Sequence, residues 1–395
     1  MLSVDDALSA VLDGVDALDA EDAPLTALCG RILARDALAG ATQPPFAASA
    51  MDGYAVRFAD MAVGARLSVI GEAPAGAPFA GAVGAGQAVR IFTGAVVPAG
   101  ADHVLIQEDA AREGDAITVQ AEQPAPRHIR EAGLDFRQGD VLAPAGTRLH
   151  ELHGAIFAAG NLAAVSVHRR PRVAFFANGD ELVDPGSALR PGQVVNANPF
   201  ALSEMVRTWG GAPDYLGRAP DDPDAVRRAF ERARDADLIL PIGGASVGDH
   251  DYVKSAFAAA GGEIVFDKVA MRPGKPTWFG RLGAARVVGL PGNPASAVVA
   301  SALFAQPLLR RLAGERWRAP FVEGRLAEPL PPNGRRESYL RAEAVASAAG
   351  YSLDPADNQD SALLSPFARA NALIRRAPDA PAAAAGDPAD FVRLR

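Results

Sequence analysis

The sequence predicts a multidomain protein of mixed α/β and β architecture, with a parallel-sheet α/β domain at its centre. The chain has 395 residues, more than one hydrophobic core usually organises, so we expect two to four domains. From about Pro171 to Gly314, apolar strand-like runs alternate with helix-like segments, as in a parallel sheet covered by helices. On either side, short β-type runs between glycine- and proline-rich connections predict smaller β-rich domains.

The N-terminal part combines a helix, a β-rich insertion and a return to the first domain. Ser3–Asp6 resembles a capping box, and the apolar residues that follow recur at helical spacing. Short β-type runs occupy the stretch from about Pro44 to about Gly139, and a helix is expected over 150–159. We therefore expect a discontinuous N-terminal linker and dimerisation domain (residues 1–43 and 140–170) around an inserted β-rich domain (44–139).

The α/β domain is expected over residues 171–316, and its elements can be placed in order. Asp222-Pro223 supplies an N-cap and an N1 proline for one helix, and Gly210-Gly211 ends another. The expected strands are 173–176, 238–240 and 286–288, and the expected helices are 199–209, 223–234, 252–260 and 295–312. Residues 317–395 return to short strands and turns, which predicts a small β-barrel-like domain at the C-terminus.

Composition and charge restrict the partners of the chain. The net charge of −8 argues against nonspecific nucleic-acid binding, and no uninterrupted apolar run could span a membrane. Cys29 is the single cysteine, so an internal disulfide is excluded; we expect it in a packed helix. Without a recognisable secretion signal, the sequence predicts a cytoplasmic protein. A zinc site is not expected, because His150 and His153 have no third partner at ligand spacing.

Two glycine turns predict an anion site at one edge of the sheet. Pro241–Gly248 and Gly289–Pro294 each follow an apolar run and precede a helix. Such a turn offers backbone N–H groups and the positive end of a helix to an anion. Neither turn has the dinucleotide fingerprint or the P-loop pattern, so these nucleotide sites are excluded. Lys268, Arg272 and Lys275 supply local positive charge in an otherwise acidic chain.

Five motifs occur in one order over nearly the whole chain. They are Ser49–Val56, Thr93–Ala95 with Pro98, Gly243–Gly248, Arg272–Pro276 and Leu290–Pro294. Together they resemble the molybdopterin molybdenumtransferases of molybdenum-cofactor biosynthesis, bacterial relatives of the gephyrin E domain. The resemblance implies a homodimer of elongated four-domain subunits, with each active site between the α/β domain of one subunit and N-terminal segments of the other.

The resemblance also implies a reaction, its cofactors and its site residues. Adenylylated molybdopterin releases AMP while molybdate binds the dithiolene sulfurs, with Mg²⁺ assisting, and transient contact with other cofactor-biosynthesis proteins is compatible with this role. The positions that match the family's catalytic residues are Asp52, Thr93, Glu181 and Asp251, and some of the three carboxylates would ligate Mg²⁺. The substrate-binding positions are Arg130, Asp135, Asp221, Gly243, Gly244, Ser246, Lys268, Arg272, Lys275, Pro291, Pro294 and Ser361.

These residue types suit the implied chemistry. Breaking a phosphoanhydride requires neutralisation of charge on oxygen and a positioned attacking group. Mg²⁺ prefers one or two carboxylates together with phosphate and water. Three positions depart from the family's usual pattern: Arg272 stands where lysine is usual, Pro241-Ile242 where small hydroxyl residues are common, and Asp360-Ser361-Ala362 within a stretch that is usually glycine-rich.

Structural interpretations and other functions remain open from the sequence. Asp52-Gly53 can be an ordinary turn, Ser246 a helix cap and Glu181 an exposed loop acid. Asp221 can belong to a helix start. The alternative functions are a gephyrin-like scaffold or binding module, and a related α/β enzyme that adenylylates the pterin or hydrolyses a nucleotide.

Overall fold

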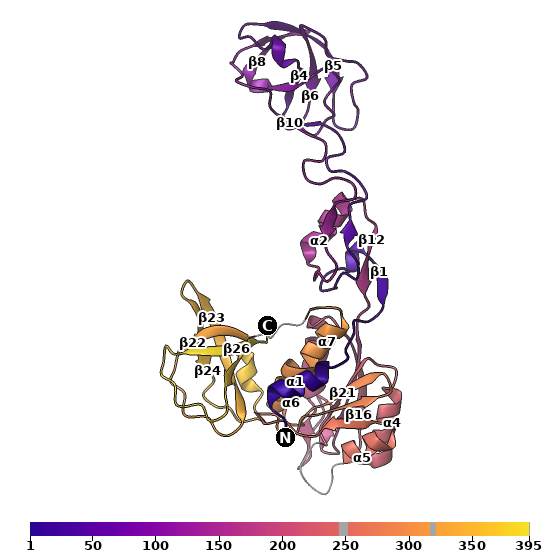
Figure 1. Cartoon of the computed structure of the whole chain (residues 1–395), viewed down its shortest axis with the longest axis vertical. Coiled ribbons are helices and arrows are strands. Elements are labelled where there is room, and N and C mark those ends of the chain that lie inside the picture. Colours follow the sequence, from indigo (N-terminus) through magenta and orange to yellow (C-terminus); the bar gives the residue numbers. More distant parts are fainter. Residues whose placement is uncertain (245–251, 317–320, 395) are drawn as a thin grey trace.

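A computed structural model describes residues 1–244, 252–316 and 321–394 of the chain. Figure 1 shows an elongated molecule, with a β-rich unit at one end and the α/β and C-terminal units at the other. A slender middle unit joins the two ends (Figure 1). Among the described residues, no helix has the length and apolar character needed to cross a bilayer.

The chain begins against the α/β unit and then builds the middle unit. Helix α1 (Val4–Leu12) is capped by Ser3, whose hydroxyl accepts from Asp6 N, and its buried face packs into the core of the α/β unit. In the middle unit, segments from either side of the insertion pair with each other. These are β1 (Ala20–Pro24) with β12 (Ala164–His168), and β2 (Ala37–Leu38) with β11 (Val141–Ala143), beside helix α2 (Glu151–Ala159).

The insertion forms a six-stranded sheet at the far end of the molecule. Its strand order is β7-β4-β6-β5-β9-β8. The strands are β4 (Gly53–Val56), β5 (Arg66–Ala73), β6 (Gln87–Ile91), β7 (His103–Ile106), β8 (Ala110–Glu113) and β9 (Ala116–Val119). Two further short strands, β3 (Ala48–Ser49) and β10 (Ile129–Arg130), pair where the chain enters and leaves this unit.

The α/β unit contains a six-stranded sheet of order β16-β13-β17-β21-β20-β18. Its strands are β13 (Arg172–Asn178), β16 (Ala212–Ala219), β17 (Leu238–Ile242), β18 (Glu263–Phe266), β20 (Trp278–Leu282) and β21 (Ala285–Gly289). Helices α1, α3 (Asn198–Thr208), α6 (Pro294–Ala300) and α7 (Gln306–Leu312) share a core on one face, and α4 (Pro223–Arg232) and α5 (Tyr252–Ala259) pack on the other.

The α/β fold confirms the expected strands and helices and adds two features. The expected strands β13, β17 and β21 are parallel, with the unpredicted β16 beside β13, but β20 and β18 continue the sheet in antiparallel pairing. The helix expected over 295–312 contains a π-type turn, Ser301–Ala305, between α6 and α7. Pro307 follows this turn; because proline lacks an N–H and its ring clashes with the preceding turn, a regular α-helix cannot continue through it.

The helix expected around Cys29 is wrong. Leu25–Ala27 forms a single 3-10 turn, and Cys29 is exposed, while Leu28 and Ile32 are buried. Gly30 has φ +77°, a left-handed conformation that ends helical geometry at this point. The buried neighbours therefore belong to an irregular segment of the middle unit.

The C-terminal unit is a closed five-stranded barrel. Its strands pair in the cycle β23-β24-β22-β26-β25-β23, which confirms a barrel-like β architecture. They are β22 (Phe321–Leu326), β23 (Glu337–Ser347), β24 (Gly350–Pro355), β25 (Ala372–Arg376) and β26 (Pro388–Arg393). One edge of β23 also pairs with β19 (Met271–Arg272), a short strand of the α/β unit, so the two units are joined by backbone hydrogen bonding.

Candidate functional site

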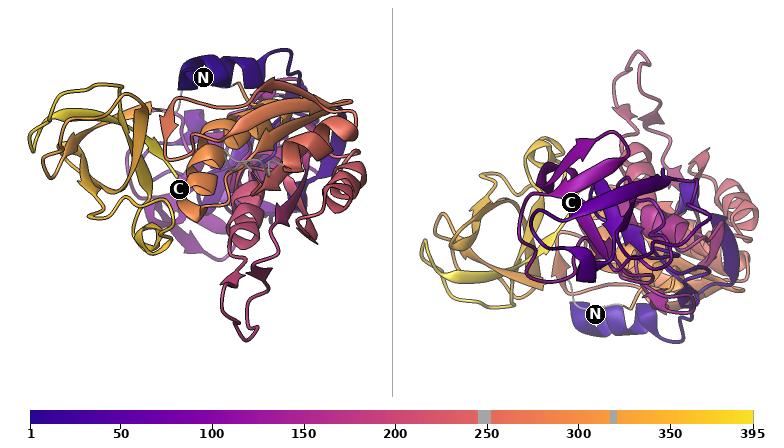
Figure 2. Two further views of the ribbon diagram at one scale, coloured as in Figure 1. Left: turned by 90° about the horizontal axis from the view of Figure 1, so that it is seen from below. Right: turned by 90° about the horizontal axis from the view of Figure 1, so that it is seen from above.

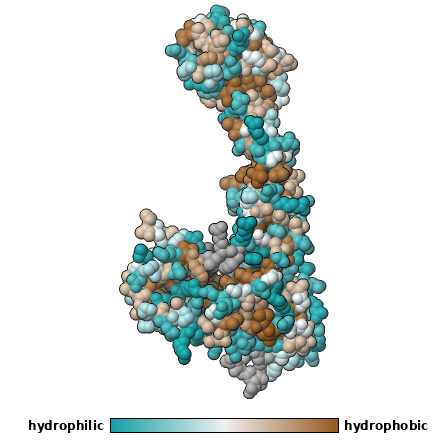
Figure 3. Space-filling view, viewed as in Figure 1, coloured by the Kyte–Doolittle hydropathy of each residue, from teal (hydrophilic) through white to brown (hydrophobic). Residues whose placement is uncertain are grey.

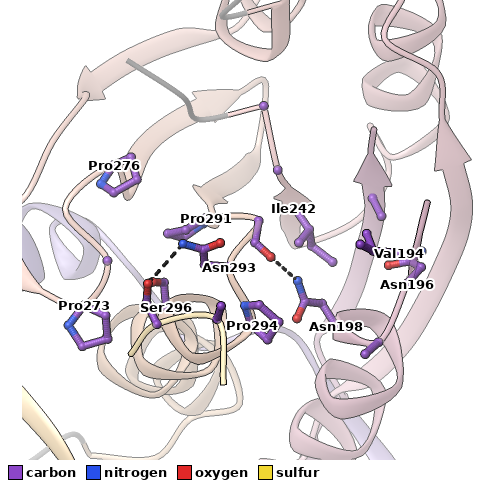
Figure 4. A pocket seen from close by; sticks show the side chains of 18 of the residues that line it. Val194, Asn196, Asn198, Ile242, Pro273, Pro276, Pro291, Asn293, Pro294 and Ser296 are labelled. Atoms are coloured by element: carbon purple, nitrogen blue, oxygen red, sulfur yellow. Dashed lines mark hydrogen bonds between the residues drawn. The ribbon is translucent and has the colours of Figure 1, made fainter. Parts of the chain in front are cut away.

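A cavity of about 850 Å³ opens at the carboxyl ends of the parallel strands of the α/β unit. Loops after β13, β17 and β21 form one side, the segment 272–276 forms another, and residues 359–362 of the barrel close a third. Figure 4 labels residues of the first two walls, among them Ile242, Pro291 and Pro273. This is the edge at which a doubly wound sheet binds ligands.

The first glycine turn must be glycine for steric reasons. Gly243 and Gly244 have φ of +93° and +65°, a region that other residues rarely adopt. A Cβ at Gly243 would lie 2.7 Å from Asn178 O, and one at Gly244 would lie 2.1 Å from a methyl group of Val253. Both glycines line the cavity. The remainder of this motif, including Ser246, and the predicted carboxylate Asp251 lie outside the described residues.

The second glycine turn leads into α6 and is held from two sides. Pro294 occupies the first turn of α6, and the backbone N–H of Ala295 donates to Ser361 O over 3.0 Å. The Asn293 amide donates to Ser361 Oγ over 3.1 Å. Asn198 donates to Gly292 O over 2.8 Å, as Figure 4 shows. The barrel therefore contributes Ser361 to the helix terminus, and Pro291 and Pro294 line the cavity beside it.

The segment 272–276 provides the cationic wall. Arg272 and Lys275 are exposed and line the cavity, and within the described parts of the chain neither forms an ion pair. Arg336, which directly precedes β23 of the barrel, lines the same wall and donates to Met271 O over 3.2 Å. Lys268 is not among the lining residues; its ammonium lies 3.6 Å from the Asp267 carboxylate.

Of the predicted catalytic carboxylates that the structure describes, Glu181 lines the cavity and Asp52 does not. Glu181 follows Gly179, whose φ is +148°, and its carboxylate oxygens lie within 2.7 Å of where a Cβ of Gly179 would stand. The turn is braced by a reciprocal pair: Asp180 N donates to the Asp221 carboxylate over 3.2 Å, and Asp221 N donates to the Asp180 carboxylate over 3.3 Å. Asp221 therefore supports the turn of Glu181 and does not itself line the cavity.

Apolar side chains that follow Glu181 also line this cavity. After Glu181 the chain forms β14 (Leu182–Val183), which pairs in parallel with β15 (Val194–Val195). Leu182, Val194 and Val195 line the cavity, and the loop between the two strands projects from the unit (Figure 2). The cavity thus combines an apolar side, a carboxylate and a cationic side, which suits a ligand with a flat body and anionic groups.

The second cluster of predicted residues lies at the other end of the molecule. Asp52 Oδ1 accepts from Thr93 N over 2.7 Å and from Thr93 Oγ1 over 2.8 Å. These two hydrogen bonds, the backbone one first, lower the pKa of Asp52 and leave Oδ2 for another partner. Residue 53 must be glycine because strand β7 lies very close to it: a Cβ there would lie 2.0 Å from Leu105 O. Arg130 is exposed on β10, beside the strand that precedes Asp52.

The single chain therefore separates the predicted residues into two groups. Glu181, Gly243, Gly244, Arg272, Lys275, Pro291, Pro294 and Ser361 meet in the cavity. Asp52, Thr93 and Arg130 belong to the distant β-rich unit, and Asp135 lies in the connection below it, where its N–H donates to Gln43 O. Figure 1 shows the length of the middle unit between the two groups. One chain does not place Asp52 next to Glu181.

Several cavity residues were not predicted from the sequence. Arg336, Gln359, Asn196 and Asn198 line the cavity but belong to no motif. Asn196 and Asn198 lie around the start of α3, and Arg336 and Gln359 lie in two loops of the barrel, and isolated polar residues of this kind carry no recognisable spacing. Asn293 lies within a predicted motif, but its bond to Ser361 depends on how the barrel docks.

The comparisons with known proteins agree with this architecture over the whole chain. Residues 2–160 match the MoeA N-terminal region (domain I and II), 174–311 a probable molybdopterin binding domain, and 323–394 the MoeA C-terminal region (domain IV). A molybdopterin molybdenumtransferase of Nostoc sp. is 38% identical over 355 residues, covering 86% of this chain and 81% of that protein. The chain belongs to the molybdopterin molybdenumtransferase family.

Further relatives and solved structures support this membership. The molybdopterin molybdenumtransferase of Haemophilus influenzae is 37% identical over 324 residues, covering 81% of this chain and 80% of that protein. A crystal structure of a molybdopterin biosynthesis MoeA protein from Pyrococcus horikoshii matches with a TM-score of 0.86 and 29% identity, covering 100% of this chain and 99% of that chain. The family resemblance predicted from five motifs is thus confirmed.

Proposed function

We propose that this protein inserts molybdenum during molybdenum-cofactor biosynthesis, as a molybdopterin molybdenumtransferase that acts on adenylylated molybdopterin and molybdate and releases AMP. The observation that carries the proposal is the cavity itself. It combines Glu181, the cations Arg272, Lys275 and Arg336, and the start of α6 in a chain whose net charge is −8. Local positive charge in an acidic protein is expected where an anionic substrate binds.

Each wall of the cavity has a role in this proposal. The guanidinium groups and Lys275 hold the anionic groups of the substrate, because cations and backbone N–H groups lower the energy of charged oxygens. The apolar wall of Leu182, Val194 and Val195 covers the flat pterin body. Glu181 faces the reacting end, where a carboxylate can orient a polar group or hold a cation.

Magnesium fits the carboxylates without a preformed cluster. Among the described residues no group of three or more metal-binding side chains lies together, but Mg²⁺ commonly uses only one or two carboxylates with phosphate and water. Glu181 of one subunit and Asp52 Oδ2 of a second subunit are the donors that would hold it, because one chain keeps the two residues apart. When bound, Mg²⁺ neutralises charge on phosphate oxygens.

We infer a homodimer, because Asp52 and Thr93 cannot reach the cavity of their own chain. The middle unit exposes Leu38, Val141, Leu152 and Ile156, with exposed fractions of 38–68%. Figure 3 shows apolar residues gathered at this narrow part of the molecule. Exposed apolar patches of this kind commonly mark protein contacts. A second copy docked there would bring Asp52 of one subunit towards Glu181 of the other. We also propose that the protein is cytoplasmic.

Reconstitution tests the function directly. Purified protein is mixed with adenylylated molybdopterin, Mg²⁺ and molybdate, and AMP release and molybdenum incorporation are followed together. Glu181→Gln preserves shape and deletes charge, so we expect substrate binding to persist while both rates fall about 100-fold or more. Glu263→Gln, an exposed acid on the edge strand β18, is the matched control and should keep wild-type rates. Wild-type turnover by Glu181→Gln would show that Glu181 has no role in the active site.

A further inference from the structure

The backbone that leads into the cationic wall is bonded to the N-terminus on one side and to the barrel on the other. Leu2 N donates to Lys268 O over 3.4 Å, and Ala270 N donates to Leu2 O over 2.8 Å. On the other side, Glu337 N donates to Ala270 O over 3.0 Å, and β19 pairs in parallel with β23 through Met271–Glu337 and Arg272–Ser338. The backbone just before Arg272 is therefore bonded on one side to Leu2, through an isolated bridge at Val269, and on the other side to β23.

A buried polar cluster lies where these strands meet. Glu337 is 6% exposed and Tyr339 is 1% exposed. Glu337 Oε1 accepts from the Tyr339 hydroxyl and from Arg375 Nε, the latter over 2.7 Å. Arg375 also reaches the Asp5 carboxylate of α1 at 3.4 Å, so the cluster links the barrel to the first helix. Burial, followed by the bond to Glu337, raises the pKa of Tyr339, which keeps its hydroxyl a donor.

The cluster is adjacent to both arginines of the wall. Arg336 directly precedes Glu337 and donates to Met271 O over 3.2 Å. Its own carbonyl accepts from the Asn333 amide over 3.0 Å, and Asn333 Oδ1 accepts from Ser338 Oγ over 2.8 Å. Arg272 stands opposite Ser338 in the pairing of β19 with β23. A shift of β23 would therefore move both guanidinium groups relative to the turns that face them.

We propose that Glu337 is a positioning residue for substrate binding. By tying the start of β23 to β25 through Arg375, which in turn reaches Asp5 of α1, it fixes the part of β23 that pairs with β19 and so sets the places of Arg272 and Arg336 in the cavity. Glu337 does not line the cavity, so it acts through its neighbours and not by touching the substrate. A buried carboxylate without its partners is costly, which makes the arrangement of the cluster specific. The inference rests on the proposed function, in which these cations bind the anionic substrate.

The test compares Michaelis parameters in the reconstituted reaction. Glu337→Gln keeps the shape of the side chain and removes its charge. Tyr339→Phe removes only one hydroxyl group, so this milder variant should remain folded. We expect each to raise the KM for adenylylated molybdopterin, about fivefold to tenfold for Glu337→Gln, with kcat changed less than about twofold. Backbone amides of 268–276 should exchange hydrogen faster in both variants.

The matched control removes a half-buried ion pair at the amino ends of the strands, away from the cavity. Asp237 accepts both guanidinium N–H groups of Arg169, each over 2.7 Å, and Arg172 N, also over 2.7 Å, just before β17. Asp237→Asn should lower stability and leave KM and the exchange of 268–276 unchanged. A general loss of stability would instead raise KM in all three variants, which would overturn the inference.

A double-mutant comparison separates this inference from the function on which it rests. If Glu337 acts through the wall, Arg272→Gln together with Glu337→Gln should raise KM by less than the product of the single effects. An unchanged KM in folded Glu337→Gln and Tyr339→Phe, alongside a raised KM in Arg272→Gln, would overturn the positioning role alone. An unchanged KM in Arg272→Gln itself would overturn the cationic wall of the proposed function as well.

Discussion

Arg341 is a buried arginine that builds the barrel loop of the cavity, and Arg341→Met tests that role. The side chain is 1% exposed. Its guanidinium donates to Leu363 O over 2.8 Å, Asp360 O over 3.0 Å, Asn358 O over 3.2 Å and Gln359 Oε1 over 3.3 Å. The segment 358–363 therefore wraps around one cation, and Ser361 stands at its centre. Methionine keeps an apolar chain of similar length and removes all four hydrogen bonds.

The expected cost follows from those four bonds. Hydrogen bonds to charged groups are worth about 1.5–3 kcal/mol each. The loop is exposed, however, so its carbonyl groups can bind water once the arginine is removed, and the net loss is smaller than the sum. We therefore expect a loss of about 3–5 kcal/mol concentrated in the barrel, roughly 1 kcal/mol for each of the neutral acceptors left without a donor. Because Ser361 would lose its fixed place beside Asn293, the KM for adenylylated molybdopterin should rise.

Denaturant unfolding and steady-state kinetics measure the two effects. Arg325→Met is the control, because Arg325 is exposed on the same barrel and donates to a single carbonyl, that of Gly386. It should change stability by less than about 1 kcal/mol. Wild-type stability and KM in Arg341→Met would refute the view that this arginine organises the loop.

Three further predictions concern other parts of the chain. His103 is fully buried and accepts from Arg127 N over 3.0 Å, and burial, followed by the charges of His128 and Arg127, lowers its pKa from 6.5 to about 4. Between pH 4 and pH 6.5 the unfolded chain therefore binds more protons at His103 than the folded chain does. The free energy of unfolding should fall by about 3 kcal/mol as the pH drops from above 6.5 towards 4. In pH-dependent melting experiments, His103→Asn should make stability less dependent on pH over this range. Gly53→Ala should destabilise the β-rich unit by about 2 kcal/mol or more, measured by calorimetry, because its Cβ would overlap Leu105 O. Lys275→Ala should weaken binding of adenylylated molybdopterin at low ionic strength and have a smaller effect at high salt, measured by titration calorimetry.

The sequence predicted the features that depend on local geometry. Gly243, Gly244 and the turn before Pro294 stand at strand ends because their backbone conformations or positions demand those residues, so short motifs revealed them. Strands β13, β17 and β21 were recognised because buried parallel strands are continuous apolar runs. The N-cap of α4 at Asp222 was equally visible, since a capping side chain acts within three residues.

Features that depend on contacts between distant segments could not be predicted. β20 contains Gly280 and Arg281 and reads as a weak strand, yet it pairs with β21 because the two share a tight hairpin. Arg336 reaches the cavity only because the barrel docks on β19, and nothing in its neighbours indicates that contact. The exposure of Cys29 was missed because the spacing of Leu28 and Ile32 matches a helix face, although Gly30 ends the helical path.

The central claim is that each active site combines the cavity of one subunit with the Asp52 cluster of the other, and subunit mixing tests it most directly. Asp52→Ala and Glu181→Ala chains should each be inactive alone. At full exchange of equal amounts, half of the dimers are mixed and each has one intact site, so about a quarter of wild-type activity should return. No recovery of AMP release, with exchange verified by differently tagged subunits, would contradict a site shared between subunits.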